Sequence, residues 1–157
     1  MKKLILRSTV LMMAVVALTV ASGEVPDMHG GGSLEGSMWQ SQVTLTDCNG
    51  NTLAVFSAFE MFNQGGTLTS TDNTPPTLHG PGLGTWERTG MRSFRAPFQF
   101  FNFNPDGSFA GTQKIDRQIH LSNHGNSYTS TVTFQRYDPA GNLVFSGCGS
   151  EIAARLP

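Results

Sequence analysis

Apolar and polar residues alternate over short stretches along most of this chain, and no stretch keeps the spacing of an amphipathic helix. Such alternation is typical of β-strands whose two faces meet different surroundings. The pattern predicts eight strands and no helix. Their ranges are 38–48, 53–62, 67–71, 85–88, 92–103, 109–121, 127–137 and 143–155.

The connectors between these strands are rich in glycine, asparagine, aspartate and proline, which favour tight turns. Hairpin-length connectors join consecutive strands into a meander. One connector, 72–84, is long, and its three prolines and three glycines argue against regular structure. A meander of eight strands removes its two free edges by pairing its first strand with its last. We therefore expect an all-β protein with a closed, eight-stranded, antiparallel up-and-down barrel.

The N-terminal segment does not follow this alternation. Lys2, Lys3 and Arg7 precede an apolar run at 8–20, and small residues follow at 21–23. This order predicts a signal peptide at 1–23, cleaved near Ser22 or Gly23, and therefore a secreted or periplasmic protein. The apolar run is shorter than the roughly 20 residues that a membrane span needs, so we expect no stable membrane anchor.

The remaining chain of about 134 residues suffices for one domain of ordinary size. Residues 24–36 are rich in glycine and predict a flexible leader, and residues 37–157 form the predicted barrel domain. The net charge is -1, and the few lysines and arginines are scattered. A nucleic-acid partner is therefore not expected, because no basic patch is present to bind phosphates.

Cys48 and Cys148 are the only cysteines, and in an oxidising compartment they predict a disulfide; two buried thiols are the alternative. If they lie opposite each other on the antiparallel first and last strands, Ser41 lies opposite Arg155. Trp39 is then one diagonal step from Arg155, on the face away from the cysteines. We expect Trp39 and Arg155 to meet, as structural residues.

These two residues carry a family resemblance. Gly36-Ser37-Met38-Trp39 near the start of the first strand, with Arg155 at the end of the last, resembles the calycin arrangement of lipocalin-like barrels. In that family a tryptophan at the closed end is covered by a basic side chain. The family usually shows Gly-x-Trp, and here that tighter spacing occurs instead at Gly84-Thr85-Trp86. Bacterial barrels of the allene oxide cyclase type are a second family that looks similar.

The calycin resemblance implies a closed end near Trp39 and Arg155 and an open mouth at the opposite end. Connectors 49–51, 72–84, 104–108 and 138–142 would rim this mouth, which places the long connector on the open side.

Alternation assigns an aromatic interior, with arginines as candidate polar groups within it or at its rim, Arg88 among them. These side chains would line a ligand cavity or, alternatively, would fill the barrel, with the arginines in water at strand ends. The candidate ligand-binding residues are Trp86, Phe98, Phe100, Arg117, Tyr128, Phe134, Arg136 and, from the long connector, His79.

Catalytic chemistry has little support, and whether the protein is an enzyme is left open. The motifs of the common enzyme classes do not occur. His79 could serve as acid, base or metal ligand, or lie on an ordinary surface. Glu60 and Glu87 could form a carboxylate pair, but we expect both to face solvent. No metal and no cofactor are expected.

The leading hypothesis is a barrel that binds a small, largely apolar ligand in its interior. The alternatives are a cyclase-type barrel enzyme, in which a cavity folds a reactive substrate, and a structural or interaction protein with a filled core.

Overall fold

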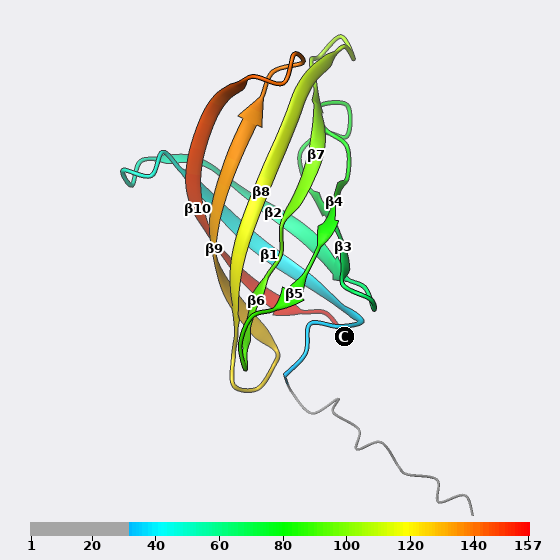
Figure 1. The fold of residues 1–157 in the computed structure, drawn as a ribbon, viewed down its shortest axis with the longest axis vertical. Coiled ribbons are helices and arrows are strands. Elements are labelled where there is room, and N and C mark those ends of the chain that lie inside the picture. The colour runs from blue at the N-terminus through cyan, green and yellow to red at the C-terminus, as the bar shows by residue number, and fades with distance from the viewer. Residues whose placement is uncertain (1–31) are drawn as a thin grey trace, which may run out of the picture.

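The computed structural model describes residues 32–157, which form an all-β, closed, antiparallel barrel with no helix in this range (Figure 1). The predicted signal peptide and residues 24–31 of the predicted leader lie outside the described residues. The strands are β1 Ser37–Thr46, β2 Thr52–Phe62, β3 Thr67–Asp72, β4 Gly82–Thr85, β5 Glu87–Arg88, β6 Ser93–Arg95, β7 Phe98–Phe103, β8 Phe109–Leu121, β9 Ser127–Tyr137 and β10 Leu143–Arg155.

The ten segments make eight barrel strands, as predicted, because two strands are interrupted. Trp86 separates β4 from β5, and Ala96 and Pro97 separate β6 from β7. Proline has no N–H to donate to a neighbouring strand, which explains the second break. The fourth strand begins at Gly82 rather than at the predicted Thr85, because residues 82–85 pair with β3 and residues 83 and 84 also pair with β7.

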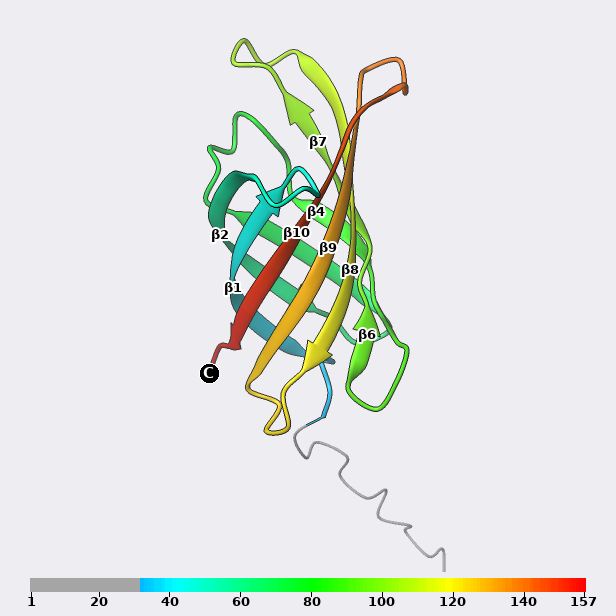
Figure 2. The same ribbon diagram turned by 90° about the vertical axis from the view of Figure 1, so that its left-hand side faces the viewer.

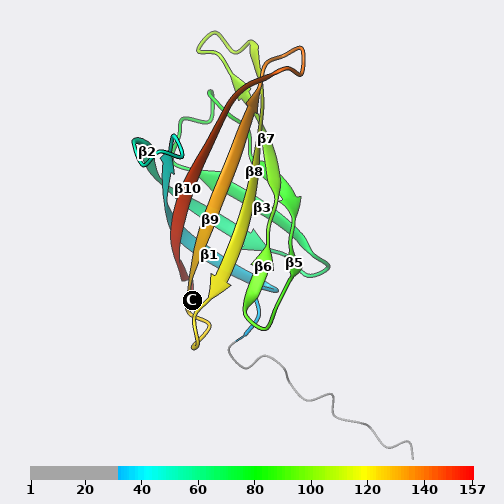
Figure 3. The same ribbon diagram turned by 60° about the vertical axis from the view of Figure 1, so that its left-hand side comes forward.

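The barrel closes where β1 pairs with β10, and these two strands lie side by side in Figure 3. Trp39 lies opposite Arg155, so the predicted register, with Ser41 opposite Arg155, is wrong by two residues. The Cys48–Cys148 disulfide is present, but Cys48 lies in the turn beyond the end of β1 with a φ of 64°. A shift of two residues keeps every side chain on its predicted face, because side chains alternate with a period of two.

Side chains fill one half of the barrel. On β9 the predicted inward residues Tyr128, Ser130, Val132 and Phe134 are buried, and the threonines between them are exposed.

In the half that contains Trp39, buried apolar side chains pack together, and we call this group the closed-end core. Its members are Leu34, Trp39, Phe62, Leu68, Phe94, Ala96, Ile119, Leu121, Tyr128 and Ala153, with Trp86 and Phe98 packed against them.

The last residues of the predicted leader belong to this closed end. Leu34 is fully buried in the closed-end core, which differs from the expected flexible segment. The guanidinium of Arg155 lies 4.7 Å from the centre of the Trp39 ring, and its Nη2 donates a hydrogen bond to the Ser33 carbonyl at 2.6 Å. The predicted meeting of Trp39 and Arg155 is therefore present, and Arg155 also binds the backbone of Ser33.

The other end is the mouth. The connectors around 47–51, 73–81, 104–108 and 138–142 gather toward this end, opposite the short turns that follow β2, β5 and β8 (Figure 2). Within the long connector, the Gly80 N–H donates to the Phe101 carbonyl and the Phe103 N–H donates to the Leu78 carbonyl. Residues 78–80 therefore extend the barrel wall beside β7, although the sequence predicted no regular structure there.

Candidate functional site

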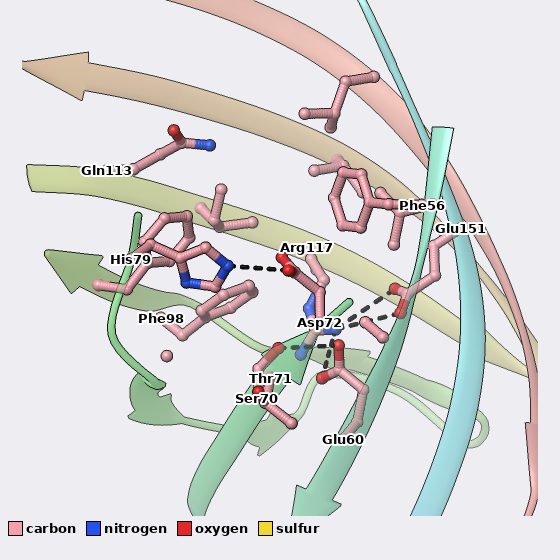
Figure 4. A pocket seen from close by; sticks show the side chains of 17 residues that line it. Phe56, Glu60, Ser70, Thr71, Asp72, His79, Phe98, Gln113, Arg117 and Glu151 are labelled. Atoms are coloured by element: carbon pink, nitrogen blue, oxygen red, sulfur yellow. Dashed lines mark hydrogen bonds and ion pairs between the residues drawn. The ribbon is translucent and has the colours of Figure 1, made fainter. Parts of the chain in front are cut away.

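A cavity of about 50 Å³ lies inside the mouth half of the barrel, beyond the closed-end core (Figure 4). Most of its wall is aliphatic or aromatic, and several polar side chains also face it. The apolar lining residues are Val43, Leu45, Phe56, Ala58, Phe98, Phe100, Ile115 and Val132. The polar lining residues are Glu60, Ser70, Thr71, Asp72, His79, Gln113, Arg117 and Glu151.

Three buried charged side chains meet at this cavity: Glu60 from β2, Arg117 from β8 and Glu151 from β10. Arg117 Nη1 lies 2.6 Å from Glu60 Oε2 and 3.3 Å from Glu151 Oε1. All three side chains are at most 3% exposed. Charges so deeply removed from water require close partners of opposite sign, and here one guanidinium serves two carboxyl groups.

The two carboxyl groups differ in the hydrogen bonds that they accept from hydroxyl groups. Tyr128 and Ser130 donate to the two oxygens of Glu151, at 2.9 and 2.7 Å. Glu60 receives only a longer hydrogen bond from Ser70, at 3.2 Å. The carboxyl group of Glu151 therefore accepts two short hydrogen bonds from hydroxyl groups, and that of Glu60 accepts one longer one.

Burial and the charges of the cluster's own members shift the pKa values of three of its side chains. Burial raises the pKa of Glu60 to about 7; Arg117 opposes this rise and the charge of Glu151 adds to it. Burial by itself lowers the pKa of Arg117, but the two carboxyl groups outweigh it and raise that pKa overall. Burial, followed by the charge of Glu151, raises the pKa of Tyr128 well above its ordinary value, so its hydroxyl remains a donor. Glu60 can therefore gain or lose a proton near neutral pH.

Two atoms of the cluster lack an aligned hydrogen bond within residues 32–157. They are Arg117 Nη2 and Glu60 Oε2, although Oε2 is in ion-pair contact with Arg117 Nη1. The guanidinium also lies over the Phe98 ring, 4.8 Å from its centre. Buried polar atoms in native proteins are nearly always satisfied by protein, water or ligand. Among the described residues, Arg117 Nη2 is therefore a donor without a partner beside the cavity, and the neighbouring oxygen Glu60 Oε2 pairs only with Arg117 Nη1.

A second polar pair lies at the cavity wall nearer the long connector. His79 Nε2 is 2.8 Å from Asp72 Oδ1, and His79 Nδ1 is 2.7 Å from the Gly80 carbonyl. The imidazole packs against Phe100, with ring centres 4.9 Å apart. Both ring nitrogens face oxygen acceptors, and only the doubly protonated imidazole donates to both at once.

The structure divides the predicted ligand-binding residues among three places. His79, Phe98, Phe100 and Arg117 line the cavity. Phe134 and the exposed Arg136 line a wider opening of about 540 Å³ at the mouth, which shares Leu45 and Gln113 with the cavity wall.

The other two predicted residues do not line the cavity: Tyr128 belongs to the closed-end core and Trp86 packs against it. Trp86 donates its Nε1 hydrogen to the Asn63 carbonyl, and Tyr128 reaches the charged cluster only through its hydroxyl. Arg88, the third arginine expected in or near the interior, is exposed and lies over the Phe94 ring.

The sequence analysis missed both carboxyl groups of the cluster. Glu60 was expected to face solvent, and this is wrong, whereas Glu87 is exposed as expected. The alternation held the signal, because Ala58 and Phe62 share the inward face with Glu60, and Ala153 shares it with Glu151. An acid at an inward position of a strand predicts a buried carboxyl group that needs a partner.

In residues 32–157, no three histidine, cysteine, aspartate or glutamate side chains gather as ligands for a metal ion. The same part of the chain contains no helix that is long and apolar enough to cross a membrane. Comparisons with protein-family models, with curated proteins and with solved structures found no match. The fold and the site define a closed β-barrel with a charged cluster beside an interior cavity, and its disulfide indicates an oxidising environment.

Proposed function

We propose that this protein is a secreted or periplasmic barrel that binds a small, largely apolar ligand in its cavity. The observation that carries the proposal is an interior cavity with mostly apolar walls and a few convergent polar groups, which is the usual composition of a ligand site. Its volume of about 50 Å³ favours a small or narrow ligand, because common sites measure roughly 300–1,000 Å³. The adjoining opening at the mouth has room for the rest of a longer molecule.

The proposal is also supported by the predicted signal peptide, by the disulfide and by the arrangement of the closed end. The predicted signal peptide and the Cys48–Cys148 disulfide both suit a protein that works outside the cytoplasm. Arg155 over Trp39 at the closed end is the arrangement on which the resemblance to lipocalin-like barrels rests. That resemblance implies binding through the opposite end.

The test combines detection of a retained molecule with a variant that fills the cavity. We expect native mass spectrometry of the purified mature protein to detect a retained small molecule, and calorimetry to detect binding of octan-1-ol. Ala58→Leu should weaken octan-1-ol binding at least about tenfold, because Ala58 is buried in the cavity wall. Ser57→Leu is the matched control, since Ser57 lies next along β2 and is exposed. Equal binding by both variants would place the ligand elsewhere.

A cyclase-type enzyme is the second candidate, and the polar residues of the cavity favour it. Glu60, with a pKa of about 7, can exchange a proton near neutral pH, and Arg117 can stabilise negative charge on a substrate oxygen. Incubation of a retained molecule with the protein should then change its chromatographic retention. This change should not occur with the Glu60→Gln variant. If the wild-type protein also leaves the chromatographic retention time of the molecule unchanged, catalysis is contradicted.

A further inference from the structure

The hydrogen-bonding groups of the charged cluster restrict which ligand head group the cavity accepts. Arg117 Nη2 is a donor without a partner among the described residues, on a side chain that is 3% exposed. Glu60 Oε2, 2.6 Å from the same guanidinium, accepts no aligned hydrogen bond. A ligand oxygen that accepts from Arg117 Nη2 would satisfy the donor, and a hydroxyl could also donate to Glu60.

The charges that line the cavity disfavour an anionic head group. Three carboxyl groups, Glu60, Asp72 and Glu151, face one guanidinium, Arg117, and one imidazole, His79. With Glu60 ionised, the lining is net negative even when His79 is protonated. A ligand carboxylate would therefore bring a fourth carboxyl group into a poorly hydrated site, where repulsion between like charges is strong.

A cationic head group fits no better. An ammonium group has three donors and no acceptor, so it leaves Arg117 Nη2 unsatisfied. It would also place a second positive charge beside a guanidinium that already pairs with both Glu60 and Glu151.

We infer that the cavity selects molecules with an uncharged oxygen head group, a hydroxyl or a carbonyl, held by Arg117 Nη2. The apolar remainder of the ligand lies along Phe56, Leu45 and Val132 toward the mouth. This inference rests on the proposed function and adds the chemical class of the ligand.

A matched series of ligands tests the head group on the wild-type protein. Octan-1-ol, octanoate and octylamine have the same chain length and differ only at the head, and calorimetry at pH 8 gives their dissociation constants. We expect the alcohol to bind at least about tenfold more tightly than either charged compound. If octanoate or octylamine binds as tightly as the alcohol, the head-group inference is overturned while the binding function stands. If none of the three binds, the binding function itself is overturned.

A charge substitution tests the cause of the selectivity. Glu60→Gln removes one negative charge from the lining and keeps the size of the side chain. We expect the preference for octan-1-ol over octanoate to fall at least about threefold in this variant. Glu87→Gln is the control, because Glu87 is exposed on β5, and it should retain the wild-type preference. An unchanged preference in folded Glu60→Gln would overturn the charge argument, and the wild-type series remains decisive if that variant does not fold.

Discussion

Replacing Glu60 by glutamine should make the stability of the barrel less dependent on pH. The pKa of Glu60 is about 7 in the folded protein and 4.5 for the ordinary side chain. Between these values the folded state holds a proton that the unfolded chain has lost, so the free energy of unfolding falls as pH rises. At about 1.4 kcal/mol per pH unit, this window corresponds to a loss of roughly 3 kcal/mol. The amide does not titrate, so the variant should avoid this loss.

Urea unfolding at pH 5 and pH 8, followed by the fluorescence of Trp39 and Trp86, measures this difference. Glu87→Gln is the control, since the Glu87 side chain is exposed and should not affect the pH dependence. If Glu60→Gln loses as much stability between pH 5 and pH 8 as the wild type, the assignment of Glu60 as the titrating group is refuted. A large loss of stability at both pH values would instead show that the cluster requires a carboxylate at this position.

The aspartates in the mouth turns do not interfere with this measurement. Hydrogen bonds from side chains within their own turns are the main cause that lowers the pKa values of Asp47, Asp106 and Asp138. Groups with lowered pKa values contribute stability above their unfolded pKa and lose it as pH falls through the folded pKa. Their effects therefore lie below about pH 4, outside the window assigned to Glu60.

Three further substitutions test the frame around the cavity by urea unfolding. Replacing Cys48 and Cys148 together by serine should cost about 4–5 kcal/mol, because the bridge links positions 100 residues apart; an unchanged midpoint would contradict this. Phe62→Ala should cost about 3–5 kcal/mol, since Phe62 is fully buried in the closed-end core; a cost below about 1 kcal/mol would show that this core repacks. Gly111→Ala should cost more than about 1 kcal/mol, because Gly111 has a φ of 114° and an added Cβ would clash with the Tyr137 carbonyl; wild-type stability would refute that strain.

Much of the fold could be predicted from the alternation of apolar and polar residues along the sequence. Alternation placed Arg117 on the same face as Ile115 and Ile119, and all three are buried. The cysteine pair indicated that the first and last strands are neighbours. The register was wrong because Cys48 lies in a turn, and the conformation of a turn depends on hydrogen bonds such as those that Asp47 accepts.

The residues of the candidate site could be predicted from the sequence only in part. Arg117, Phe98 and Phe100 were assigned to the interior and do line the cavity. Tyr128 and Trp86 lie in or against the closed-end core instead, because alternation gives the face of a side chain and not its height along the barrel. Where the filled core ends and the cavity begins depends on how side chains from all eight strands pack together.

By itself, the sequence determined an all-β chain, the closing pair of strands and the direction in which most side chains face, because these follow from local alternation and from two cysteines. The tertiary structure alone decided that Glu60, Arg117 and Glu151 meet. These residues come from β2, β8 and β10, and a separation in sequence does not encode a distance in space. Their meeting depends on barrel closure and register, which place one guanidinium between two carboxyl groups and bury Glu60, and this burial raises the pKa of Glu60 to about 7.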